Sequence, residues 1–240
     1  MKIYDVVVIG LGAMGSATLY QLSKEDKNIL GIDKFAPPHT LGSSHGDTRI
    51  TRRAIGKGAH YTPYVLRANE IWKEIEELSG ETLYHKVGGL IISSVDVTVK
   101  NHVDEFFENT VESAEKHNIE YRQLTADEIK KAFPTIRVEK DEVGYFEPDA
   151  GYLVPEKCIK IQLDLAQKNG AELHTNEELV KYFKNPNTGL IEVTTNKRVY
   201  TTKKLVLSSG SYLNPFLPKE YQDIFKVYRQ VLYWFDIEDS

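Results

Sequence analysis

The chain has 240 residues, of which 41% are apolar and 27% charged, which is enough for one large or two small domains and excludes general disorder. Thirty basic and thirty-five acidic residues leave a formal charge of −5, which argues against a general nucleic-acid binder because phosphate binding needs a basic surface. The single cysteine excludes an internal disulfide and a cysteine-rich zinc site, and it fits the cytoplasmic location that we expect.

The apolar N-terminus has only a superficial likeness to a secretory signal. A single basic residue, Lys2, precedes the apolar run, Asp5 comes before it, and three glycines interrupt it, whereas a signal needs an unbroken apolar stretch. No other segment approaches the roughly 18 consecutive apolar residues of a membrane span. The scattered histidines lack metal-ligand spacing, so we expect neither a membrane anchor nor a metal site.

The N-terminal segment, as far as Asp33, predicts a βαβ start. The valine-rich run Ile3–Ile9 is typical of a strand buried on both faces, and residues 10–15 turn the chain into a helix over 16–25. Residues 28–33 then form a second short strand that ends in an acid. Apolar spacing and turn residues predict further elements: helices over 63–79, 103–117 and 158–169, and strands over 87–93, 171–174, 190–195, 198–201, 205–207 and 227–235. Residues 185–189 are a turn, with 190–195 and 198–201 as the hairpin strands around it.

A GxGxxG motif lies between the first strand and the first helix. Gly10 permits the tight turn, Gly12 lets a pyrophosphate approach the backbone, and Gly15 lets helix and strand pack closely. The start of the helix offers unpaired N–H groups and a favourable dipole to phosphates. Asp33, at the end of the second strand, is placed to accept hydrogen bonds from ribose hydroxyls. The motif therefore predicts a dinucleotide site without choosing between a nicotinamide and a flavin.

A basic loop follows the second strand. Three of the eight arginines of the chain, Arg49, Arg52 and Arg53, fall within five residues in a segment rich in Gly, Ser and His. Such a cluster could receive an anionic group near the cofactor through bidentate contacts. The same charge pattern also fits a solvated basic loop.

Several segments together resemble one known family. They are the Gly10 to Gly15 motif with Asp33, the Pro37-Pro38-His39 segment, the loop that contains His45-Gly46-Asp47-Thr48-Arg49, and Tyr228-Arg229-Gln230-Val231. In these residues the chain is similar to the monomeric sarcosine oxidase family, which includes N-methyl-tryptophan oxidase and belongs to the FAD-dependent amine and amino-acid oxidases. The similarity is collinear over nearly the whole chain.

The resemblance implies an α/β fold with a Rossmann-type FAD-binding domain, interrupted by a substrate domain on a mixed β-sheet. We expect the FAD-binding domain over 1–82 and 151–218, and the substrate domain over 83–150 and 219–240. Members of the family continue past residue 240 with a segment that holds FAD covalently through a cysteine. Cys158 does not replace that cysteine, because a small buried thiol in a helix is its ordinary interpretation.

The resemblance also implies site residues and chemistry. His45 and Arg49 are expected beside the flavin as catalytic residues, and Arg52 is expected to pair with the substrate carboxylate. The implied contacts to FAD are Gly10, Gly12, Gly15, Asp33, Lys34, Ser43, Thr48, Ser209 and Gly210. The implied reaction removes hydride equivalents from the N-methyl carbon of a secondary amino acid; the imine hydrolyses to an aldehyde, and dioxygen reoxidises the flavin to give hydrogen peroxide. The implied partners are a small-molecule amine and dioxygen.

Two other functions remain open from the sequence. A nicotinamide-dependent dehydrogenase would use the same βαβ start, and a non-catalytic FAD-binding fragment would carry the same glycine motif. The particular amine also stays open, because Ser44 and Arg53 stand where the family often has histidine. Tyr61 and Tyr64 could reach a substrate pocket or simply pack on the surface.

Overall fold

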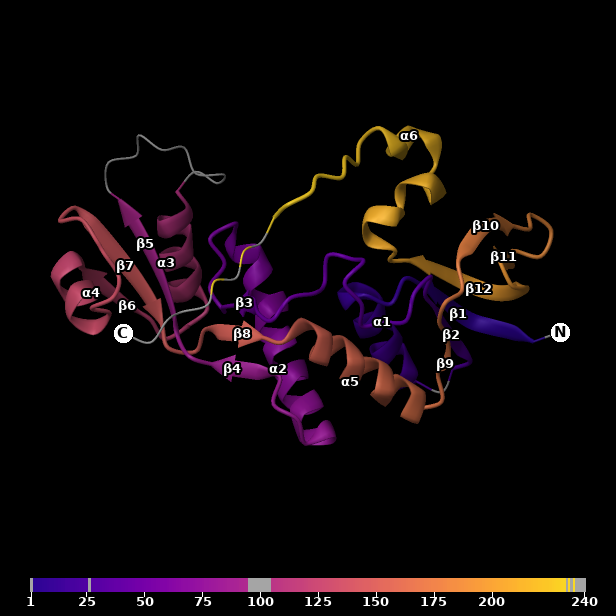
Figure 1. Ribbon diagram of the computed structural model, residues 1–240, viewed down its shortest axis with the longest axis horizontal. Coiled ribbons are helices and arrows are strands. Elements are labelled where there is room, and N and C mark those ends of the chain that lie inside the picture. The colour runs from indigo at the N-terminus through magenta and orange to yellow at the C-terminus, as the bar shows by residue number, and fades with distance from the viewer. Residues whose placement is uncertain (1, 26, 95–104, 232, 234, 236–240) are drawn as a thin grey trace. The chain divides into compact units, whose positions relative to one another are not determined.

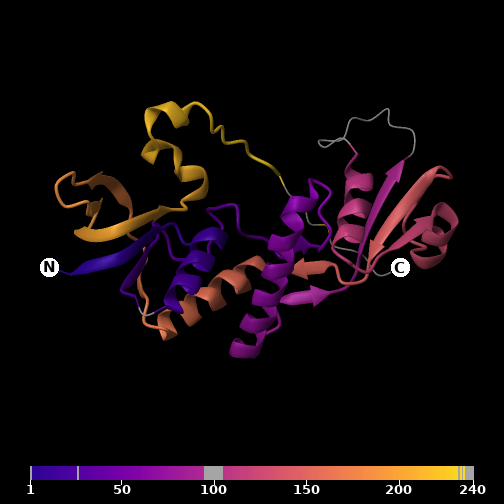
Figure 2. The same cartoon turned by 180° about the vertical axis from the view of Figure 1, so that it is seen from behind.

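The computed structural model describes residues 2–25, 27–94, 105–231, 233 and 235 (Figures 1 and 2). The chain divides into two compact units, one of residues 1–43 with 166–240 and one of residues 44–165. The division falls within helix α5 (Pro155–Lys168). The units are described separately below.

The first unit is built on a six-stranded mixed sheet of order β10-β11-β12-β1-β2-β9. Its strands are β1 (Ile3–Ile9), β2 (Ile29–Ile32), β9 (Glu172–His174), β10 (Leu179–Lys184), β11 (Ile191–Thr195) and β12 (Val199–Leu207). Strands β12, β1, β2 and β9 are parallel, whereas β10, β11 and β12 form an antiparallel meander. Ile9 is in register with both Leu207 and Ile32, so three parallel strands end at the same edge.

Burial of its apolar side chains explains why the first strand forms. Residues 6–9 are all buried, as expected for a central strand with both faces covered. They contribute to a cluster of apolar side chains from five strands: Tyr4, Val7, Ile9, Leu30, Ile32, Leu179, Val193 and Tyr200. Full burial of one such aliphatic side chain contributes about 1.5–3 kcal/mol.

Helix α1 (Ala13–Ser23) begins and ends slightly earlier than the helix over 16–25 that the sequence analysis predicts. It begins within the glycine motif because Gly12 has the extended conformation of a capping residue, after which Ala13 starts the helix. At its other end the Ser23 hydroxyl donates to the Tyr20 carbonyl oxygen over 2.7 Å. The side chains of Leu11 and Leu19 lie over Gly31, where an added Cβ would come within 3.0 Å of both.

In its described residues the second unit contains two antiparallel three-stranded sheets and three α-helices, besides the larger part of α5. One sheet has the order β3-β8-β4, from Arg49–Thr51, Gly151–Leu153 and Tyr84–Lys86. The other has the order β5-β7-β6, from Gly89–Ser94, Glu142–Glu147 and Arg122–Thr125. The helices are α2 (Thr62–Ser79), α3 (Phe106–Lys116) and α4 (Ala126–Ala132), and a short 3₁₀ turn, η1, covers Ala59–Tyr61. Helix α4 begins with a capping box between Thr125 and Glu128.

The predicted α/β class and Rossmann-type start are confirmed, with several local differences. Strand β5 begins at Gly89 and not at residue 87, because Gly88 has φ +81° and breaks the extended chain. Helix α5 starts at Pro155, since proline is tolerated in the first turn of a helix. The start of the predicted helix over 103–117 lies partly outside the described residues, and α3 begins at Phe106. Gly170, at φ +96°, follows α5 as expected.

Two predictions near the end of the chain are wrong. The turn at residues 185–189 joins β10 to β11, and the hairpin of β11 with β12 turns instead at residues 196–198. The described residues of the predicted strand 227–235 lie outside any strand, because none of them pairs with another described strand. Short helical elements precede them: η2 (Gly210–Tyr212), η3 (Asn214–Phe216) and α6 (Lys219–Gln222).

The two compact units show how the chain packs, but they do not show which segments bind a cofactor or a substrate. The predicted division into an FAD-binding domain and a substrate domain therefore stays a prediction. Among the helices that the structure describes, none combines the length and apolar character needed to cross a membrane.

Candidate functional site: a dinucleotide edge and an arginine loop

The loops that follow β1, β2 and β12 meet at one edge of the six-stranded sheet (Figure 1). Strand β1 lies between β2, the next strand in the sequence, and β12, the last of the described strands. Such a reversal of strand order opens a crevice beyond the carboxyl ends of parallel strands, where α/β folds bind ligands. The residues at this edge therefore form the first candidate site.

The glycine loop makes a turn that leaves no room for side chains. Gly10 has φ +86°, a conformation that favours glycine, and its N–H donates to the Ile32 carbonyl oxygen over 2.8 Å. A Cβ at Gly15 would lie 1.7 Å from the Gly10 carbonyl oxygen. The Ser16 N–H donates to the Gly12 carbonyl oxygen over 2.9 Å, which continues the turn into α1. The tight turn thus places the start of α1, with its N–H groups, directly after the carboxyl end of β1, which is the position where such folds bind a pyrophosphate.

A second loop, Ser208 to Gly210, packs against the glycine loop. The Ser208 hydroxyl donates to the Gly10 carbonyl oxygen over 2.8 Å, and a Cβ at Gly10 would lie 2.6 Å from the Ser209 Cα. The Ser209 Oγ is buried and has no hydrogen-bond partner among the described residues. A buried polar atom without a partner is costly, and a ligand oxygen beside it would remove that cost.

Asp33 is buried, with 6% of its surface exposed, and both of its carboxylate oxygens accept backbone N–H groups. The Leu11 N–H donates over 2.6 Å and the Phe35 N–H over 2.8 Å. The structure therefore shows Asp33 holding the glycine loop to the end of β2. Each oxygen keeps a further lone pair for a ribose hydroxyl, the contact that the sequence predicts.

Lys34, the next predicted cofactor residue, is bonded to other side chains. Its ammonium group donates to Glu178 over 2.8 Å and lies 5.6 Å from the centroid of the Tyr212 ring. The hydrogen bond to Glu178 raises the pKa of Lys34. In this conformation Lys34 ties the end of β2 to the segment before β10.

A buried polar network supports Asp33 from the other side, and the sequence analysis did not find it. Glu177, which is 2% exposed, accepts hydrogen bonds from the Thr195 hydroxyl at 2.6 Å and the Tyr200 hydroxyl at 2.8 Å. Burial acts to raise the pKa of Glu177, but these hydrogen bonds and the charge of His174 outweigh it and keep the pKa below its ordinary value. The backbone of Asp33 bonds to this segment twice, through the His174 carbonyl oxygen and the Glu177 N–H.

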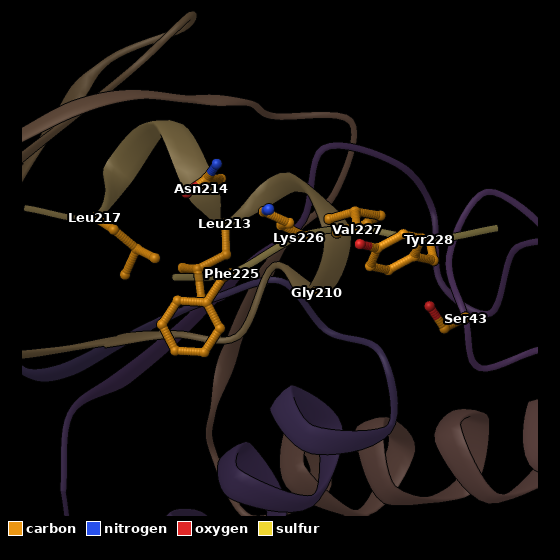
Figure 3. Close-up of a pocket in the computed structure, with 10 residues that line it drawn as sticks. Ser43, Gly210, Leu213, Asn214, Leu217, Phe225, Lys226, Val227 and Tyr228 are labelled. Carbon is orange, nitrogen blue, oxygen red and sulfur yellow. The ribbon is translucent and has the colours of Figure 1, made fainter. Parts of the chain in front are cut away.

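A cavity of about 320 Å³ adjoins the second loop (Figure 3). Its walls come from Ser43, the helical segment after Ser209, and the chain around Phe225: Ser43, Gly210, Ser211, Leu213, Asn214, Leu217, Phe225, Lys226, Val227 and Tyr228. Figure 3 shows Ser43 and Tyr228 toward one end of the view and Leu217 toward the other. Ser43 and Gly210, two predicted cofactor contacts, thus share one cavity.

The other predicted site residues lie in the second unit. The Arg49 guanidinium donates to the His45 carbonyl oxygen over 3.0 Å, so the structure brings the two predicted catalytic residues together. The loop between them is fixed by Gly46, whose N–H donates to the Glu156 carboxylate over 2.6 Å. Thr48 and Arg49 are exposed.

Arg52 and Arg53 are neighbours with different surroundings. The Arg53 guanidinium forms an ion pair with Asp149, which also pairs with Lys86. Arg52 forms no ion pair with a described carboxylate; its guanidinium lies 5.4 Å from the centroid of the Phe106 ring, and its buried Nε has no partner among the described residues. Of the two, Arg52 is the one whose guanidinium has no carboxylate partner among the described residues.

Three further residues from the sequence analysis can be placed. Tyr61 and Tyr64 are exposed near the start of α2. Cys158 is buried in α5, and burial raises the pKa of its thiol to about 12. Among the described residues no group of three or more His, Cys, Asp or Glu could hold a metal ion.

Comparison with known proteins agrees with this arrangement. The model of the family described as FAD dependent oxidoreductase, DAO, matches residues 5–239. The chain is 36% identical over 238 residues to monomeric sarcosine oxidase of Bacillus sp. (strain B-0618), covering 99% of this chain and 59% of that protein. It is 32% identical over 215 residues to N-methyl-L-tryptophan oxidase of Yersinia pestis (strain Pestoides F), covering 90% and 56%. The chain thus spans less than two thirds of the length of these curated relatives, and its predicted resemblance to them is confirmed.

Solved structures show the same fold. NikD, an unusual amino acid oxidase essential for nikkomycin biosynthesis, superposes in its open form with a TM-score of 0.77 and 25% identity, over 90% of this chain and 53% of NikD. L-proline dehydrogenase from P. horikoshii superposes with a TM-score of 0.76 and 22% identity, over 90% and 55%, which supports the fold. Since the family model matches almost the whole sequence, the chain belongs to the FAD dependent oxidoreductase family.

Proposed function

We propose that the chain binds FAD at the edge formed by the glycine loop, Asp33 and the Ser208 to Gly210 loop. Three observations support the fit. Gly10 and Gly15 leave no room for a side chain, so the glycine turn packs closely against the Ser208 to Gly210 loop and leads directly into the start of α1, where a pyrophosphate would bind. The buried Ser209 Oγ lacks a described partner. The Asp33 carboxylate keeps acceptor capacity for ribose.

We further propose that the protein oxidises a secondary amine that carries a carboxylate, such as an N-methyl amino acid, with dioxygen as the acceptor. The observation that carries this proposal is the guanidinium of Arg52, which has no described carboxylate partner although Arg53 beside it has one. The names of the relatives, sarcosine oxidase and N-methyl-L-tryptophan oxidase, fit such a substrate. In the proposed reaction the imine hydrolyses to an aldehyde, and dioxygen is reduced to hydrogen peroxide.

The roles of the residues follow from their chemistry. When bound, FAD supplies the acceptor for the hydride equivalents that leave the amine. Arg52 orients the substrate through its carboxylate, since a planar guanidinium matches a carboxylate with two parallel hydrogen bonds. Arg49 donates to the main chain of His45 and places a positive charge in this loop, where it would stabilise developing negative charge, and His45 is proposed to lie beside the flavin. The other proposed contacts to the cofactor are Lys34, Ser43 and Gly210 of the first unit and Thr48 of the second unit.

Two measurements test cofactor and reaction in turn. A visible absorbance spectrum of the purified protein, repeated on the supernatant after acid precipitation, should show a flavin that moves into the supernatant, because none of the described cofactor contacts is a cysteine. A colourless protein that takes up NAD and not FAD would contradict the assignment in favour of a dehydrogenase. A flavoprotein that consumes no oxygen with any N-methyl amino acid would support the non-catalytic FAD-binding alternative.

Arg52→Ala tests the substrate class. It should raise the KM for sarcosine by a factor on the order of 100, the equivalent of about 3 kcal/mol for a lost charged hydrogen bond, and change little the KM for sarcosinamide, which lacks the carboxylate. Arg67→Ala is the matched control, because Arg67 is exposed and pairs with Glu70 in α2. Equal losses for sarcosine and sarcosinamide would refute the role of Arg52 in carboxylate binding.

A further inference from the structure

Glu147, at the end of β7, is a carboxylate that the proposed reaction does not use. It is 1% exposed. Its Oε1 accepts the Arg53 N–H at 2.7 Å, and its Oε2 accepts the Ala54 N–H at 3.1 Å and the Tyr145 hydroxyl at 3.0 Å. Burying a carboxylate is expensive unless hydrogen bonds compensate for the lost water, and here three donors do so.

These hydrogen bonds join segments that are far apart in the sequence. Glu147 is 94 residues from Arg53 and 93 from Ala54. Two consecutive N–H groups bind the two oxygens of one carboxylate, which fixes the peptide planes directly after Arg52. The backbone of Glu147 is part of the antiparallel pairing of β7 with β5, in which Glu147 is in register with Gly89. The carboxylate thus joins the backbone at Arg53 and Ala54 to the β5-β7-β6 sheet.

The side chains near Glu147 interact differently with Arg52 and Arg53. Asp149 follows shortly after Glu147, and its carboxylate pairs with the Arg53 guanidinium and with Lys86. The Tyr84 hydroxyl donates to the backbone carbonyl oxygen of Asp149. The Lys86 hydrogen bond, with the charge of Arg53, keeps the pKa of Asp149 below its ordinary value. Burial and Glu147 raise the pKa of Tyr145, whereas the charge of Arg52 acts to lower it, so Arg52 lies within electrostatic reach of the same cluster.

We propose that Glu147 is a positioning residue for Arg52: its carboxylate fixes the backbone at Arg53 and Ala54, so that Arg53 turns to Asp149 and Arg52 remains available to the substrate carboxylate. This inference rests on the proposed substrate role of Arg52. Glu147 itself does not touch the substrate. Its effect is on the direction of the Arg52 side chain, and a shift of about 1 Å in such a group can cost on the order of 100-fold in rate.

The test uses Glu147→Gln in the FAD-loaded protein. The amide keeps the size of the side chain but offers one acceptor oxygen and turns its NH₂ group toward an N–H donor. Hydrogen–deuterium exchange at the Arg53 and Ala54 amides should accelerate about tenfold or more, since one of the two bonds is lost. The KM for sarcosine should rise on the order of 10- to 100-fold, with little change in the KM for sarcosinamide.

Glu142→Gln is the matched control, because Glu142 lies at the other end of β7 and accepts the Glu139 N–H over 2.7 Å. It should change neither the exchange at residues 53 and 54 nor the KM values. If Glu147→Gln does not fold, Tyr145→Phe is the second test of the positioning role, since it removes one of the three donors and keeps the carboxylate. A smaller rise in the KM for sarcosine alone supports the inference, and an unchanged KM contradicts it.

The outcomes separate this inference from the proposed function. If Arg52→Ala affects sarcosine and sarcosinamide equally, the proposed role of Arg52 fails whatever Glu147→Gln does. If Arg52→Ala discriminates between them but Glu147→Gln raises both KM values equally, or leaves exchange at residues 53 and 54 unchanged, only the positioning role of Glu147 is overturned.

Discussion

Replacing Gly15 by alanine places a methyl group inside the turn that starts α1. The new Cβ would lie 1.7 Å from the Gly10 carbonyl oxygen and 2.8 Å from the Ser208 Oγ, so the carbonyl oxygen has to retreat by about 1.3 Å to reach even the 3.0 Å limit of real Cβ contacts. Overpacking of this kind costs about 1–3 kcal/mol. The displaced carbonyl oxygen also loses its hydrogen bond from Ser208, which contributes about 1 kcal/mol. We expect Gly15→Ala to lower the free energy of unfolding by about 2–4 kcal/mol.

The assay is urea unfolding of the variant and the parent protein, with an FAD titration of each. Gly189→Ala is the matched control in the same unit: Gly189 has φ +71°, and apart from its chain neighbours no described atom lies within 4 Å of an added Cβ. The control therefore measures only the backbone penalty of about 1 kcal/mol. It should leave the Kd for FAD unchanged, whereas Gly15→Ala should raise it. Equal losses of stability in the two variants, with the same Kd for FAD, would refute the steric argument.

Three further predictions concern stability and reactivity. Glu177→Gln should lower the free energy of unfolding by about 1–3 kcal/mol near neutral pH. Because the pKa of Glu177 is depressed in the folded protein, the stabilisation is complete above its unfolded value of 4.5 and is lost as the pH falls through the folded pKa; urea midpoints of parent and variant should therefore converge in acid. Thr125→Ala removes the capping box of α4 and should cost about 1 kcal/mol in urea unfolding, while an unchanged midpoint would contradict the cap. The Cys158 thiol, with its pKa raised to about 12 by burial, should react with iodoacetamide at about pH 8 slowly in the native protein and quickly in urea; rapid native alkylation would contradict its burial.

The sequence predicted best where a local pattern decides the structure. The valine run, the glycine turn and the acid after the second strand all lie between Ile3 and Asp33, and each follows from its own neighbours. Strand β10 has no such pattern: its sequence Leu-Val-Lys-Tyr-Phe-Lys does not alternate apolar with polar residues, and in the structure only Leu179 of the six is buried. The predicted strand over 227–235 has the apolar pattern, but a strand also requires a partner, and none is present among the described residues.

The candidate site was likewise predictable only where local sequence features define it. Gly10, Gly15 and Asp33 could be identified from spacing, because the turn, the helix start and the strand end are all local features. The difference between Arg52 and Arg53 was not, since it depends on Asp149, which is remote from both in the sequence. For the same reason neither Glu147 nor Glu177 was found: a buried carboxylate is identified by donors that only the fold brings together.

The order of strands in the six-stranded sheet has a consequence for synthesis. During translation β1 and β2 leave the ribosome first, yet the neighbour of β1 on its other side, β12, is made only after all of residues 44–165. The second unit is therefore complete while β1 still has an unpaired edge, and an unpaired edge of an apolar strand is the kind that pairs with other chains. The contact of Gly10 with Ser209 can form only after residue 209 has been made. If FAD binds at this edge as proposed, its capture reports on the pairing of β12 with β1 and not on the formation of the first strands.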